Sequence, residues 1–89
     1  MFIHIGGDTM VCMKDVIGIF DIHVQESPLT AKFIELAKRN EAVEIVELGE
    51  IKSFVVTEQK LYYSPISSLT LKKRAHLLDS GGRMEQESE

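Results

Sequence analysis

The fold is decided by the stretch Ser53-Phe54-Val55-Val56-Thr57-Glu58-Gln59-Lys60-Leu61-Tyr62-Tyr63. Two runs rich in β-branched and aromatic residues flank three polar residues, a pattern typical of two strands joined by a short turn. A third apolar run, at 43–46, comes shortly before them, and Gly49 marks the turn between. Because both connections are too short for a crossover, these three runs predict an antiparallel meander.

The N-terminal part of the chain also has strand character. Phe2-Ile3-His4-Ile5 and the apolar run 10–13 are separated by the turn residues Gly6-Gly7-Asp8-Thr9, which predicts a hairpin. The run 16–22 is β-branched enough to predict a strand that is mostly buried on both faces. Gly18 inside this run indicates a bulge or a close approach of another segment.

Two segments have helical periodicity. Ser27-Pro28 is a typical helix start, because a serine oxygen can accept from free N–H groups of the first turn and proline at the first position loses no hydrogen bond. The apolar residues of a helix over about 28–40 then recur at helical spacing, and they are Leu29, Phe33, Leu36 and Ala37. A second helix begins with Ser67 or Ser68 as its N-cap. Its apolar face consists of Leu71, Ala75 and Leu78.

The order ββ(β)-α-βββ-α predicts the α+β class: a small, mostly antiparallel sheet with two helices. The chain has 89 residues, 44% hydrophobic and 27% charged, which indicates one globular domain. One cysteine allows no internal disulfide, so a domain of this size gains much from burial between subunits, and we expect a homo-oligomer.

The acidic charge is concentrated at the C-terminus. Residues 1–76 carry nine Lys and Arg against ten Asp and Glu, net −1, whereas residues 77–89 carry one against four, net −3. The segment 79–89 also contains paired glycines and a single hydrophobic residue. We therefore expect a domain over 1–78 and a disordered acidic tail over 79–89.

No residue pattern supports catalysis. The histidines are scattered without ligand spacing, at His4, His23 and His76. Cys12 is expected to be a small core hydrophobe, and Gly6-Gly7-Asp8 lacks the continuation of a phosphate-binding loop. We expect no enzyme, no cofactor and no metal site. No segment reads as a membrane span or a leader peptide, which predicts a cytoplasmic location and no membrane partner.

Basic residues are the candidates for a nucleic-acid-binding site. Lys72-Lys73-Arg74 is the densest positive charge in the chain. Consecutive residues point in different directions around a helix, so two of these side chains can reach phosphates while the apolar face of the helix packs against the domain. An ordinary solvated helix face is the alternative interpretation. Lys14 and Lys52 are further cations at expected loop edges.

Four pieces of the chain, in order, resemble the bacterial extracellular matrix regulators of the RemA/RemB family. They are Phe2-Ile3-His4-Ile5-Gly6, the strand at 16–19, Ser53-Phe54-Val55-Val56-Thr57, and Tyr63-Ser64-Pro65-Ile66-Ser67-Ser68 followed by a helix bearing leucine and lysine. The resemblance covers about 1–76 and is closest to the RemB branch. It implies a cytosolic DNA-binding transcription regulator of matrix and biofilm genes, assembled as a ring-like homo-oligomer that presents basic residues to double-stranded DNA.

The sequence departs from the family pattern at two places. RemA-like members carry an arginine just after the second short strand, where this chain has Lys14-Asp15, and paired arginines after the middle glycine, where it has Glu50-Ile51 followed by Lys52. A carboxylate at a phosphate-contact position repels DNA. Two hypotheses follow: a homo-oligomeric DNA-binding regulator that contacts phosphates through Lys14, Lys52, Lys72, Lys73 and Arg74, or an oligomeric protein-interaction module that pairs with a second regulator without binding DNA.

Overall fold

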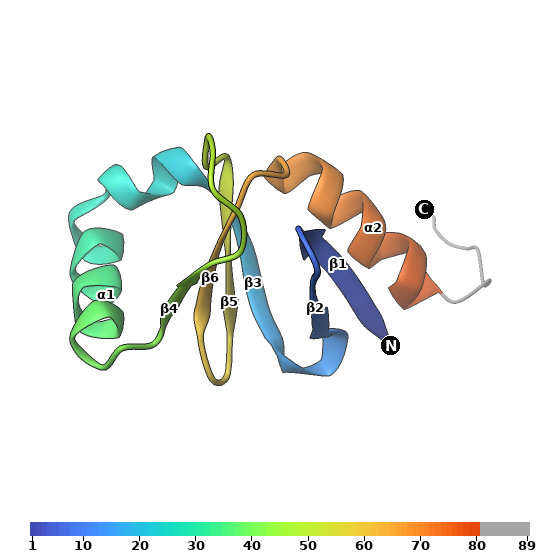
Figure 1. Cartoon of the computed structure of the whole chain (residues 1–89), viewed down its shortest axis with the longest axis horizontal. Coiled ribbons are helices and arrows are strands. Elements are labelled where there is room, and N and C mark those ends of the chain that lie inside the picture. Colours follow the sequence, from blue (N-terminus) through green and yellow to red (C-terminus); the bar gives the residue numbers. More distant parts are fainter. Residues whose placement is uncertain (81–89) are drawn as a thin grey trace.

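A computed structural model of the protein describes residues 1–80 and arranges them in the predicted element order (Figure 1). The elements are β1 (Phe2–Gly6), β2 (Thr9–Cys12), the 3-10 turn η1 (Met13–Asp15), β3 (Val16–Asp21), the 3-10 turn η2 (Ile22–Glu26), α1 (Pro28–Arg39), β4 (Val43–Ile45), β5 (Ser53–Thr57), β6 (Leu61–Ser64) and α2 (Ser68–Ser80). The α+β class is therefore confirmed. The predicted tail lies outside the described residues, apart from Asp79 and Ser80, which end α2.

Two sheets form within these residues, a β1–β2 hairpin and a four-stranded sheet in the order β3-β5-β6-β4. The β1–β2 and β5–β6 pairs are antiparallel as predicted, but the predicted meander is wrong at β4, which pairs with β6 in parallel. The reason is that α1 acts as a crossover: it returns the chain so that β4 runs in the same direction as β3. The central place beside β3 is taken by β5.

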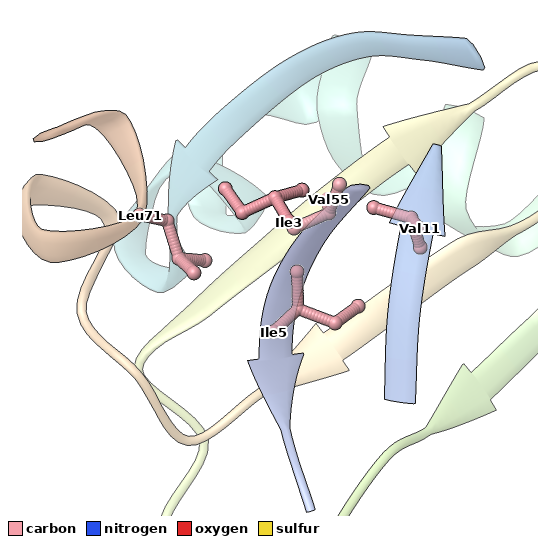
Figure 2. Close-up of a cluster of buried hydrophobic side chains, with 5 residues drawn as sticks. All are labelled: Ile3, Ile5, Val11, Val55 and Leu71. Atoms are coloured by element: carbon pink, nitrogen blue, oxygen red, sulfur yellow. The ribbon is translucent and has the colours of Figure 1, made fainter. Parts of the chain in front are cut away.

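All five residues of β5 are buried, and they contribute to two cores. Val55 points to one face of the sheet, where it packs with Ile3, Ile5, Val11 and Leu71 from β1, β2 and α2 (Figure 2). On the other face, β5 and β6 pack against α1 through Ile34. The molecule therefore has three layers, with α1 on one side of the four-stranded sheet and the β1–β2 hairpin with α2 on the other (Figure 1).

The edge strand β3 is only partly covered. The prediction that it is buried on both faces is wrong, since Ile17 is 68% exposed and Phe20 is 37% exposed. The strand lies at one edge of the sheet, where α1 does not cover it. The strand that is buried on both faces is its neighbour β5. Of the two alternatives at Gly18, the bulge is the one found, because the register with β5 shifts between Val16 and Gly18.

The apolar stripe of α1 does not face the core. Ile34 is the buried residue of the helix, whereas Leu29, Phe33 and Leu36 are 82%, 48% and 49% exposed. The helix start predicted at Ser27-Pro28 is confirmed, with Ser27 at the N-cap position, but the capping hydrogen bond expected from the serine side chain is not formed. The apolar residues that give this helix its amphipathic pattern therefore lie mostly on the surface of the domain.

Two buried serines place the connection between β6 and α2. The Ser64 hydroxyl donates to the Ile5 carbonyl at 2.6 Å and accepts from the Ile66 N–H at 3.0 Å. The Ser53 hydroxyl donates to the Ile66 carbonyl at 2.7 Å. Ile5 lies where the β1–β2 register shifts, between His4 and Gly6, so its carbonyl takes a partner from β6. These bonds position the start of α2 against β1.

The start of α2 follows the sequence prediction. The Ser67 hydroxyl accepts from the Thr70 N–H at 3.1 Å, which identifies Ser67 as the N-cap. Leu71 is fully buried and Ala75 is half-buried against the same core. The opposite side of α2 is therefore presented to solvent.

Candidate nucleic-acid interface

Lys14 and Lys52 lie at opposite ends of the β3–β5 pair. Lys14 is exposed in η1, and the carbonyl of the next residue, Asp15, accepts from the Glu58 N–H at 3.1 Å, beyond the end of β5. Lys52 precedes β5, and its carbonyl accepts from the Ile22 N–H at 3.0 Å, just after β3 ends. A single copy of the chain therefore does not bring these two cations together.

The basic triplet on α2 divides into two kinds of residue. Lys72 and Lys73 are exposed, and among the described residues no acidic side chain forms an ion pair with either. Arg74 is half-buried, and its Nη1 donates to the His4 carbonyl of β1 at 2.9 Å. Arg74 therefore anchors α2 to the hairpin, whereas the two lysines are available to a ligand.

A histidine and an aspartate pair at the end of β3. Asp21 Oδ1 accepts from the His23 backbone N–H at 2.8 Å and lies 2.7 Å from His23 Nδ1, and both side chains are exposed. The hydrogen bonds from His23, backbone first, lower the pKa of Asp21, and nearby Lys72 adds a smaller lowering. The hydrogen bond to Asp21 and its charge raise the pKa of His23. Lys72 thus lies toward the same end of the sheet as Lys52.

The outer side of α2 combines cations with apolar contacts. A shallow hollow of about 360 Å³ is lined by Leu69, Lys72, Lys73, His76 and Leu77. The sequence prediction missed the two leucines because only the triplet of charges was considered. Their spacing was the available signal, because Leu69 lies about one turn before the lysines and Leu77 about one turn after Lys73. This surface offers cationic groups to phosphate between two apolar ends.

The loop between β4 and β5 is held to the first hairpin and exposes a leucine. The Glu47 carboxylate accepts from the Gly7 N–H at 2.9 Å. Next along the chain, Leu48 is 91% exposed. Where the resemblance implies paired arginines, Glu50 is exposed and Ile51 packs against the α1-side core. This loop is therefore apolar and acidic at its tip.

Residues 1–80 contain neither a cluster of metal-ligating side chains nor a membrane-spanning helix. Across residues 1–80, no three His, Cys, Asp or Glu side chains lie close enough to hold a metal ion together. His4 Nε2 lies 2.7 Å from the Gly7 carbonyl, within its own hairpin turn, and Cys12 is half-buried. No helix in the described part of the chain is long and apolar enough to cross a bilayer.

Residues 1–80 thus form a small three-layer α+β domain with exposed lysines on α2. The profile of the RemA-like family, described as extracellular matrix regulatory protein A-like, matches residues 2–75. The chain is also 46% identical over 78 residues to extracellular matrix regulatory protein B of Bacillus subtilis strain 168, covering 88% of this chain and 94% of that protein. The chain therefore belongs to the RemA-like family, and its predicted likeness to the RemB branch is confirmed.

Proposed function

We propose that the protein is a non-enzymatic, homo-oligomeric DNA-binding regulator of transcription that acts on extracellular matrix and biofilm genes in the bacterial cytoplasm. Membership of the RemA-like family supports the regulatory role. The observation that carries DNA binding is the pair Lys72 and Lys73, exposed on α2 and without an acidic partner among the described residues. Cations on one helix face contact successive phosphates without reading base sequence.

Assembly of several copies would provide the concentrated positive charge that a single copy lacks. The chain has a net charge of −4, and Lys14 and Lys52 lie at opposite ends of its sheet. A ring-like homo-oligomer repeats the α2 lysines along one surface and brings lysines of neighbouring copies within reach of the same duplex. Repetition converts several weak phosphate contacts into one tight interaction, because the later contacts form at high effective concentration.

Binding to unrelated DNA duplexes over a salt series tests this function. Affinity should fall steeply between about 50 and about 200 mM salt, because phosphate neutralisation releases counterions. Lys72→Glu and Lys73→Glu should each weaken binding similarly for all sequences and lower the salt slope by about 1. Lys38→Glu is the matched control, because Lys38 is exposed on α1, on the other side of the sheet. Absence of retention at about 50 mM salt, or equal losses for Lys38→Glu, would reject DNA binding.

A second function, an oligomeric module that binds another regulator without touching DNA, is favoured by one observation. Leu48 is 91% exposed two positions before the exposed Glu50, which stands where the resemblance implies an arginine. An exposed leucine close in sequence to a carboxylate suits a protein surface better than a phosphate backbone. In a nuclease-treated pull-down, Leu48→Ser should then lose a protein partner and Lys73→Glu should keep it. Recovery of DNA alone by the unchanged chain would count against this function.

A further inference from the structure

The outer face of α2 is a cationic surface without an acidic partner among residues 1–80. Lys72, Lys73 and His76 line the hollow on this face between Leu69 and Leu77, and all five residues are exposed. No carboxylate lines the hollow, and neither lysine forms an ion pair within the described part of the chain. A carboxylate-bearing segment that can reach this face would therefore find two available amines.

The residues that follow α2 carry the complementary charges. Residues 81–89 lie outside the described part of the chain and contain Arg83 against three glutamates, a net charge of −2. The glutamates alternate with other residues, at Glu85, Glu87 and Glu89, and Met84 precedes them. With a single apolar residue, this stretch cannot bury a core of its own. Its carboxylates and its methionine match in kind the lysines and leucines of the hollow.

This stretch is long enough to reach the lysines from the end of α2. Ser80 ends the helix seven residues after Lys73, which is about 11 Å along the axis at a rise of 1.5 Å per residue. Glu85 follows Ser80 by five residues, and an extended chain covers up to about 17 Å over that length. Gly81 and Gly82 permit the reversal of direction that this path needs, because glycine adopts positive φ without strain. So short a tether gives the carboxylates an effective concentration in the millimolar range near the lysines.

We propose that residues 83–89, the acidic segment, bind the outer face of α2 of the same chain and compete with DNA phosphates for Lys72 and Lys73. The inference rests on the proposed function, because it assigns a regulation to the cations that carry DNA binding. The carboxylates and the phosphates are alternative partners for the same two amines. DNA binding at α2 therefore requires release of the acidic segment, and the segment limits the affinity of each copy.

Zero-length cross-linking of the full chain tests the contact in the absence of DNA. A carbodiimide joins a carboxylate to an amine that it touches, and peptide mapping then identifies the pair. Links from residues 85–89 to Lys72 or Lys73 should form at about 50 mM salt and decrease sharply at about 500 mM, because salt screens exposed ion pairs. Lys38 is the matched control and should link little, since it is exposed on α1, on the other side of the sheet (Figure 1). Equal linking to Lys38 would overturn the proposal.

Neutralising the acidic segment tests the competition with DNA. Glu85→Gln, Glu87→Gln and Glu89→Gln together should raise the affinity for any duplex about 2- to 30-fold at about 50 mM salt, because each exposed ion pair contributes a modest free energy. The gain should become smaller in a Lys73→Ala background, since one of the two contested amines is then missing. A gain that Lys73→Ala leaves unchanged would overturn the competition.

A second triple variant controls for net charge. Glu35→Gln, Glu41→Gln and Glu58→Gln remove the same three charges from exposed positions on α1, after α1 and after β5. The affinity gain of this variant should be clearly smaller, because none of its carboxylates competes for the lysines of α2. Equal gains in the two triple variants would mean a general effect of net charge and would overturn the competition.

The outcomes separate this inference from the function on which it rests. If the chain retains DNA but no link forms between residues 85–89 and α2, the acidic segment does not cover that face and the proposed function stands. If the links form but no duplex is retained, DNA binding fails and the competition fails with it. In a mixture of isotope-labelled and unlabelled copies, links found only between copies would overturn the assignment to the same chain.

Discussion

Replacing Ser64 by alanine removes a hydroxyl that joins three segments of the chain. Ser64 is fully buried, donates to the Ile5 carbonyl at 2.6 Å and accepts from the Ile66 N–H at 3.0 Å. Ile5 is itself fully buried, so its carbonyl loses a partner where water does not reach it. Ile66 is only half-buried, and its N–H can turn to solvent more easily.

The magnitude follows from those two environments. An unsatisfied buried carbonyl costs about 1 to 3 kcal/mol, and an ordinary hydrogen bond contributes about 0.5 to 1.5 kcal/mol net. We therefore expect Ser64→Ala to lower the free energy of unfolding by about 2 to 4 kcal/mol. A domain of about 80 residues has roughly 4 to 12 kcal/mol in total. The loss is therefore a large fraction of the stability.

Urea denaturation at fixed protein concentration measures this loss, and the concentration is held constant because self-association raises apparent stability. The urea midpoint should fall by at least about 1 M. Ser27→Ala is the matched control, because Ser27 is exposed and its side chain makes no capping bond, so its effect should stay within about 0.5 kcal/mol. If Ser64→Ala is as mild as Ser27→Ala, the hydroxyl does not fix the start of α2 and our reasoning is refuted.

Three further perturbations probe other parts of the fold. Leu71→Ala empties a fully buried site between α2 and β5 and should cost about 2 to 5 kcal/mol in urea denaturation, and a smaller loss would mean that the cavity collapses. Gly6→Ala should cost at least about 2 kcal/mol, because φ is +128° and a Cβ would lie 2.9 Å from Pro65 Cδ, and near-normal stability would contradict that geometry. The His23 pKa, followed by NMR, should lie above 6.5 and fall in Asp21→Asn. Because the folded pKa is raised, its stabilising effect is present below pH 6.5 and is lost as the pH rises through the folded pKa.

The local elements could be predicted from the sequence because their causes lie within a few residues. Gly6 and Gly7 adopt positive φ in the first turn, which glycine tolerates, and the register shift at Gly18 follows from a glycine inside a strand. The Ser67 cap depends only on the hydroxyl and the N–H three residues later. The family also followed from short pieces in order, without knowledge of how they pack.

The sequence identified the basic residues that could contact DNA, but not which of them lie on the same surface. The sequence places Lys72, Lys73 and Arg74 next to each other, yet the structure uses Arg74 to hold β1 and leaves the two lysines exposed. Lys14 and Lys52 look equivalent in the sequence but lie at opposite ends of the sheet. Which cations share a surface depends on the path of the chain between them, and local pattern carries no information on that path.

The sequence by itself determined the α+β class, the order of the elements, the two antiparallel hairpins and the family. Tertiary structure alone decided that β4 pairs with β6 in parallel, that β5 rather than β3 is buried on both faces, and that the apolar stripe of α1 faces outward. The physical reason is that hydrophobic periodicity identifies the apolar face of a helix or strand, but does not say which other segment packs against that face. In α1 the core buries Ile34, and the stripe of Leu29, Phe33 and Leu36 stays exposed.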